Sequence, residues 1–152
     1  MLSRKQKYVV LKFFSMFSVI RGFNISIVVL AQYFTSIYIL APDTPLSKII
    51  FDVKLFFIVV ASAAAIAGGY IINNFYDSEN DLINRPIKSR LDKLISQNTK
   101  LSFYFVLNFI AVIMASYVSF KAVLFFSIYI FGIWFYFWPY TFNIFLRIHQ
   151  LK

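Results

Sequence analysis

The residues best suited to chemistry in this chain follow a strongly apolar segment, in the stretch GGYIINNFYDSENDLINRPIKSR (residues 68–90). Asn73, Asp77 and Asp81 recur at intervals of four residues, so they share one face of a helix if the helix extends that far. Two neighbouring carboxylates repel each other and resist ionisation, and a divalent cation between them would offset that cost. Hard oxygen ligands suit Mg²⁺, which fills its remaining coordination positions with water and phosphate oxygens.

Basic side chains follow these acids directly. Cationic groups at this position are suited to the phosphate oxygens that a bound metal leaves uncovered. The residues concerned are Arg85, Lys88 and Arg90. The pattern predicts a metal–diphosphate site at the end of an apolar segment. A solvated loop of mixed charge is the alternative interpretation, because charged residues commonly follow an apolar helix.

The elements that must position these side chains are membrane helices. Of the 152 residues, 61% are hydrophobic and only 14% are charged, whereas a globular domain is roughly half apolar and a quarter charged. The chain has room for about four spans of roughly 20 residues each. Its net charge of +9 comes largely from short loops, which indicates topology rather than nucleic-acid binding. The absence of cysteine excludes disulfides, thiolate metal sites and a cysteine nucleophile.

The apolar runs predict an all-α, multi-span transmembrane bundle that forms a single membrane domain over residues 1–152. The first span is expected to end before Pro42 and Pro45, which cannot continue a helix. Lys121 alone separates the last two spans, which predicts a tight turn there. The expected spans are residues 13–40, 49–76, 101–120 and 122–146.

Lysine and arginine counts predict the orientation of the bundle. The N-terminus carries four such residues and the loop between the second and third spans carries five, including Lys100. The first loop carries only Lys48 and Lys54, and the last turn carries Lys121. By the positive-inside rule, both termini and the acidic stretch are expected to face the cytoplasm. The protein is therefore predicted to be an integral, multi-pass membrane protein.

A second candidate for chemistry lies within the first predicted span. Arg21 interrupts the apolar run, and an arginine at this depth usually faces protein or a water-filled cavity. On a continuous helix Asn24 would lie about 60° from Arg21, so both side chains are expected to line one cavity. The alternative is an arginine that extends along the helix to the cytoplasmic interface.

The stretch NNFYDSENDLINRP resembles the first aspartate-rich motif of the UbiA-type intramembrane prenyltransferases, usually written NDxxDxxxD. Asn73 matches the leading asparagine, Asp77 and Asp81 match the later two acids, and Asn84–Pro86 matches the continuation of several branches. Asn74 stands where the family usually has its first aspartate, so the metal site loses one charge. The stretch RGFN, which begins at Arg21, is similar to the family's Arg-x-x-Asn on helix one.

The resemblance implies Mg²⁺-dependent transfer of a prenyl group from an isoprenyl diphosphate to a lipid or aromatic acceptor. Membrane lipids are expected partners, and nucleic acid is not. Asn73, Asp77 and Asp81 would hold the metal, and the two aspartates would be catalytic. The residues expected to bind the diphosphate are Arg85, Lys88, Arg90, Arg21 and Asn24.

The family fold has about nine spans, and its second aspartate-rich motif has no counterpart after Asp92. The resemblance therefore implies the N-terminal half of the family fold, incomplete in catalysis alone, with a separate C-terminal half as an expected partner. The alternative function is a non-catalytic membrane module, either a truncated remnant or a half-subunit. A CDP-alcohol phosphotransferase also uses DxxxD with a divalent metal, but the Asp-Gly and Ala-Arg pattern expected before it is missing.

Overall fold

The computed structural model describes residues 3–77 and 94–150, and the side chains of residues 3–76 and 94–137. This part of the chain is helical and contains no strand, which confirms the all-α prediction. Four of its helical segments are long and apolar enough to cross a membrane. In chain order the elements are α1 (Arg4–Val19), α2 (Gly22–Thr35), the π-helical turn η1 (Ser36–Leu40), α3 (Leu46–Ile50), α4 (Val53–Asp77), α7 (Gln97–Ser116) and α8 (Phe120–Gln150).

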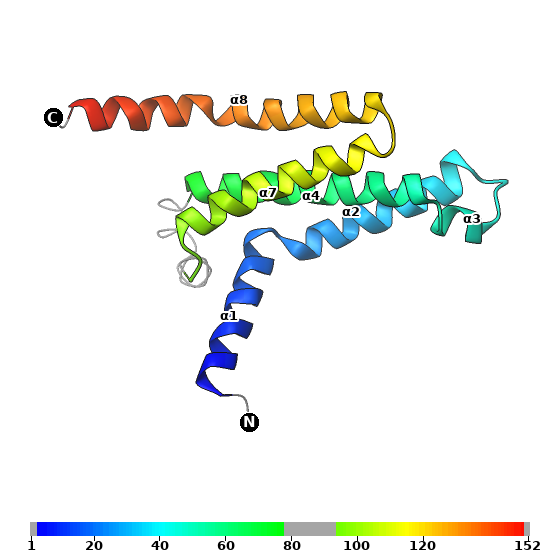
Figure 1. Cartoon of the computed structure of the whole chain (residues 1–152), viewed down its shortest axis with the longest axis horizontal. Coiled ribbons are helices and arrows are strands. Elements are labelled where there is room, and N and C mark those ends of the chain that lie inside the picture. Colours follow the sequence, from blue (N-terminus) through cyan, green and yellow to red (C-terminus); the bar gives the residue numbers. More distant parts are fainter. Residues whose placement is uncertain (1–2, 78–93, 151–152) are drawn as a thin grey trace.

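Helix α4 lies at the centre of the bundle and packs against α2, α7 and α8. Its most extensive contact is with α7, while α8 packs on both α7 and α4. Figure 1 shows these four helices running in roughly one direction, with α1 crossing the end of α2 at a steep angle. The C-terminal end of α4 and the N-terminal end of α7 therefore lie at the same end of the bundle.

Small residues allow α4 and α7 to approach closely. Ala61 and Ala65 on α4 and Ala111 and Ala115 on α7 are almost completely buried in one cluster. In a membrane the hydrophobic effect does not drive helices together, so close van der Waals packing at small residues stabilises the contact instead. Gly68 continues the contact, since a Cβ there would lie 3.3 Å from the Asn108 amide. The α4–α7 pair is thus the rigid support for what α4 carries at its C-terminal end.

The prediction of one continuous first span over residues 13–40 is wrong. The chain breaks at Arg21, whose φ of 52° lies in the left-handed region and starts α2 as its N-cap. The next residue, Gly22, is covered by the Phe17 ring so closely that any Cβ would overlap it. The backbone therefore turns sharply between α1 and α2, and the spanning segment is Gly22–Leu40.

The other predicted boundaries also shift. The second span begins at Val53, because α3 and the Asp52 cap intervene; Asp52 Oδ1 accepts a hydrogen bond from the Leu55 N–H at 2.7 Å. The third begins at Gln97, where the Ser96 hydroxyl caps the helix. Lys121 does not form the last turn. That turn precedes Phe120, and Ser119 Oγ accepts a hydrogen bond from the Ala122 N–H at 3.1 Å.

Candidate functional site

The carboxyl end of α4 carries the first residues of the acidic motif. The helix continues through Asp77, so its backbone places Asn73 and Asp77 one turn apart on the same face. Asn73 is partly buried and Asn74 is buried. The remaining predicted site residues of this region, Asp81, Arg85, Lys88 and Arg90, lie outside the described residues.

Asn74 is engaged by a cation from the neighbouring span. The Lys100 ammonium on α7 donates a hydrogen bond to Asn74 Oδ1 at 2.8 Å. Both side chains are buried, and only 3% of Lys100 is exposed. Burial of an ammonium is costly unless it is hydrogen-bonded, so this pair holds the ends of α4 and α7 together. Lys100 was expected in the loop; it lies instead in the first turn of α7.

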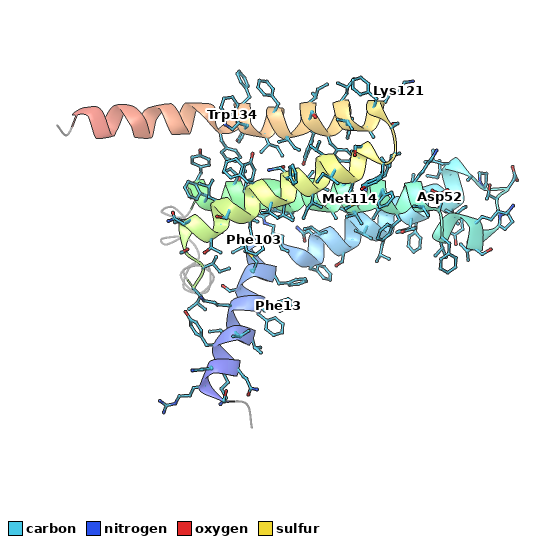
Figure 2. The ribbon with its side chains drawn as sticks, in the orientation of Figure 1. Phe13, Asp52, Phe103, Met114, Lys121 and Trp134 are labelled. Carbon is cyan, nitrogen blue, oxygen red and sulfur yellow. The ribbon has the colours of Figure 1, made fainter. Side chains whose placement is uncertain are left out.

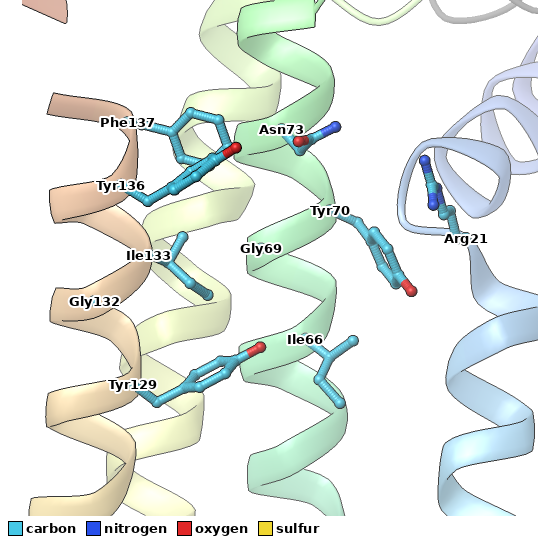
Figure 3. A pocket seen from close by; sticks show the side chains of 10 residues that line it. All are labelled: Arg21, Ile66, Gly69, Tyr70, Asn73, Tyr129, Gly132, Ile133, Tyr136 and Phe137. Carbon is cyan, nitrogen blue, oxygen red and sulfur yellow. The ribbon is translucent and has the colours of Figure 1, made fainter. Parts of the chain in front are cut away.

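A cavity of about 640 Å³ runs beside α4, bounded by residues of α8 and by Arg21. Figure 3 shows the aromatic side chains of α8 facing α4, with Asn73 nearest the C-terminal end of α4. This volume is in the range of small-molecule sites. The lining residues are Arg21, Ile66, Gly69, Tyr70, Asn73, Tyr129, Gly132, Ile133, Tyr136 and Phe137.

Arg21 lies at the polar edge of this cavity. Its guanidinium stands over the Tyr70 ring, 4.9 Å from the centroid, and Figure 3 shows the two side chains facing each other. The attraction between the cation and the ring fixes the direction of a flexible side chain. Asn24 is exposed and is not among the lining residues, because Arg21 precedes α2 rather than sharing its face.

Aromatic stacking ties α8 to the same end of α4. The rings of Tyr76 and Phe137 lie nearly parallel, with centroids 5.0 Å apart. Tyr136 and Tyr129 line the cavity, whereas Phe135 is exposed on the same helix. One face of the aromatic run of α8 therefore lines the cavity, and the other face is exposed on the outside of the bundle.

The cavity changes in chemistry along its length. Ile66, Ile133 and Gly132 provide apolar walls, three tyrosines add aromatic rings with hydroxyls, and Arg21 and Asn73 provide the charged and amide groups. The backbone of α4 continues through Asp77, one turn beyond Asn73. Sequence reasoning missed Tyr70, although it lies three residues before Asn73 on the same helix face. The arrangement is suited to a ligand with an apolar tail and an anionic head.

The described residues contain no group of three or more histidine, cysteine or acidic side chains that could hold a metal ion. They include Asn73, whose side chain carries an amide oxygen, and the backbone of Asp77, which lies one turn further along α4. Amide and carboxylate oxygens are the donor types that Mg²⁺ prefers. Asn74 is a poor metal ligand here, because its Oδ1 already accepts a hydrogen bond from the Lys100 ammonium.

Comparison with known proteins agrees with this chemistry. No curated protein and no solved structure gives a significant match to the chain. The family model described as the UbiA prenyltransferase family matches residues 16–149. That match includes the break at Arg21, the polar end of α4 and the aromatic face of α8. Since it extends over most of the sequence, the chain belongs to the UbiA prenyltransferase family.

Proposed function

We propose that this protein binds an isoprenyl diphosphate in the cavity beside α4 and takes part in transfer of its prenyl group. Membership of the family implies prenyl transfer as the general activity. The observation that supports the site is that one cavity of about 640 Å³ combines apolar and aromatic walls with Arg21 and Asn73. The tail would lie between α4 and α8, and the diphosphate would lie at the end that carries Arg21, Asn73 and Asp77.

Each described residue has a definite task in this proposal. Arg21 presents a planar guanidinium that can donate two hydrogen bonds to one phosphate group. Asn73 offers its amide to the same end of the cavity. Tyr70, Tyr129 and Tyr136 present aromatic surface, which attracts positive charge and excludes water from it. An allylic cation formed on departure of the diphosphate would lie where the tail meets the polar end of the cavity, and Tyr70 and Tyr136 would shield it there.

The acidic motif fits Mg²⁺, with Asn73, Asp77 and Asp81 as the proposed ligands. Bound Mg²⁺ would neutralise charge on the diphosphate as it leaves. Arg85, Lys88, Arg90 and Asn24 remain proposed contacts of the diphosphate. The acceptor is proposed to be a lipid or an aromatic compound, presented from the membrane. Both termini and the acidic motif are proposed to face the cytoplasm, following the distribution of basic residues.

Photo-crosslinking tests the position of the tail. An isoprenyl diphosphate with a photoreactive group at the end of its tail is bound to the purified protein and illuminated, and labelled peptides are identified by mass spectrometry. Labels are expected in α4 near Ile66 and in α8 near Tyr129 and Gly132, and excess unlabelled diphosphate should suppress them. The proposal would be contradicted if the labels that unlabelled diphosphate suppresses were confined to α2 or to the outer face of α7. Membranes that contain the protein are then supplied with labelled prenyl diphosphate and a panel of acceptors. The acceptor that becomes labelled identifies the acceptor class.

A further inference from the structure

Helix α1 differs from the other long helices in direction and composition. It runs from Arg4 to Val19 and is not one of the four segments able to span a membrane. Figure 1 shows it extending away from the bundle, from near the end at which α4 stops and α7 starts. The left-handed residue Arg21 produces this change of direction. With the four spans along the membrane normal, α1 lies along the membrane surface.

The two sides of α1 differ as an in-plane helix requires. Val9, Phe13, Phe14 and Phe17 are exposed, with 67% of Phe13 accessible. Figure 2 shows Phe13 projecting on the side toward which the spans extend, which is the side of the bilayer interior. The same helix carries four basic residues and no acid, namely Arg4, Lys5, Lys7 and Lys12. A basic amphipathic helix of this kind binds at the boundary between headgroups and acyl chains.

A groove of about 650 Å³ lies between α1 and the start of α7. Its walls include Phe13, Met16, Phe17 and Phe103. It shares no lining residue with the cavity beside α4, so the two are separate sites. The polar groups of the groove are those of Lys12, Tyr8 and the hydroxyls of Ser96 and Thr99.

These polar groups are arranged in two pairs. The Lys12 ammonium lies 4.9 Å from the centre of the Tyr8 ring, which restrains the lysine beside the groove. Ser96 Oγ and Thr99 Oγ1 are 2.7 Å apart in the first turn of α7, where the backbone also favours an anion. An apolar channel with a cation and hydroxyls at membrane-surface depth matches the acyl chain and phosphate of a phospholipid.

We propose that the groove between α1 and α7 binds an anionic phospholipid of the leaflet in which α1 lies. The acyl chain lies along Phe13, Met16 and Phe103, and the headgroup contacts Lys12 and the Ser96–Thr99 pair. Charge selects an anionic lipid, since α1 supplies four positive charges and no negative one. A soluble anion would leave the apolar walls of the groove exposed to water. This inference does not depend on prenyl transfer.

Native mass spectrometry of the whole chain tests the proposal. The protein is stripped of lipid in detergent, mixed with equal amounts of phosphatidylglycerol and phosphatidylcholine, and the retained lipid is counted. Preferential retention of phosphatidylglycerol is expected. Lys12→Gln should lower it about fivefold, the effect of one basic residue near an anionic surface. The matched control is Lys121→Gln, an exposed lysine beside the α7–α8 turn, which should leave retention unchanged.

A second variant separates the groove from general surface charge. Met16→Trp fills the groove and keeps every basic residue, so it should lower retention as strongly as Lys12→Gln. Equal retention of the two lipids by the native protein overturns the proposal. Equal effects of Lys12→Gln and Lys121→Gln, or native retention in Met16→Trp, overturn it as well. Monodisperse elution of each variant confirms that it is folded before the lipids are compared.

Discussion

Arg21 allows a prediction in which fold stability and ligand binding change independently. Its backbone adopts φ 52° and ψ 52°, a conformation that residues other than glycine rarely take. Its side chain lines the cavity beside α4 and stands over Tyr70. Arg21→Gly therefore removes backbone strain and a proposed diphosphate contact together. We expect it to leave the fold intact and to weaken binding of an isoprenyl diphosphate.

The expected change in the free energy of unfolding follows from three opposing contributions. Relief of the left-handed conformation stabilises the variant by roughly 1–2 kcal/mol. Loss of the exposed cation–π contact costs about 0.5–1 kcal/mol, and the freedom of glycine in the unfolded chain costs about 0.4–1 kcal/mol. The net change is within about 1 kcal/mol of zero. Loss of a hydrogen bond to a charged group costs about 1.5–3 kcal/mol, which weakens binding roughly 10- to 150-fold.

The assay pairs thermal unfolding in detergent micelles with equilibrium binding of a radiolabelled isoprenyl diphosphate. Arg21→Lys is the matched variant, because it keeps the charge and the backbone strain but lacks the planar guanidinium. We expect it to bind with intermediate affinity and to unfold like the native protein. Native binding by both variants would mean that Arg21 only extends to the membrane surface. Strong destabilisation by Arg21→Gly would refute the assignment of strain to this position.

Three further predictions concern the neighbouring elements. A double-mutant cycle of Lys100→Met and Asn74→Ala, read from unfolding free energies, should give a coupling of about 0.5–3 kcal/mol, and zero coupling would contradict their hydrogen bond. Gly132→Leu should fill open space in the cavity. Exclusion of two methylenes of a long prenyl tail costs about 1.6 kcal/mol, or roughly 15-fold in affinity. An equal loss of affinity for short and long tails would argue against the tail position. A reporter fused at Asn80 should signal from the cytoplasm, and a signal from the opposite side of the membrane would reverse the proposed orientation.

The membrane-spanning architecture could be predicted because long apolar runs are a strong signal in sequence. The change of direction at Arg21 could not, since the surrounding residues are apolar and a helix tolerates a single glycine at modest cost. The signal lies in Gly22, whose hydrogen accommodates the Phe17 ring. Glycine is frequent in membrane helices. Its special role here is defined only by the contact with Phe17.

The acidic motif was evident from spacing, and α4 does extend through Asp77. The contact of Lys100 with Asn74 could not be foreseen, because the two residues are 26 positions apart and meet only when α4 packs on α7. A basic residue near the end of an apolar run is typical of a loop, and this pattern gives no sign of the contact with Asn74. The aromatic residues of α8 are evident in the sequence, but only the packing of α8 on α4 identifies Tyr129 and Tyr136 as cavity residues.

We propose that the end of α4 binds a prenyl diphosphate through its acidic motif and Mg²⁺. The most direct measurement is the affinity of the purified protein for an isoprenyl diphosphate, with Mg²⁺ and after removal of the metal by EDTA. Asp77→Asn is compared with Asp43→Asn, an exposed acid in the loop at the opposite end of the bundle. We expect Mg²⁺-dependent binding that falls at least about tenfold in Asp77→Asn and is unchanged in Asp43→Asn. Equal affinity without Mg²⁺, or native affinity in Asp77→Asn, would contradict it.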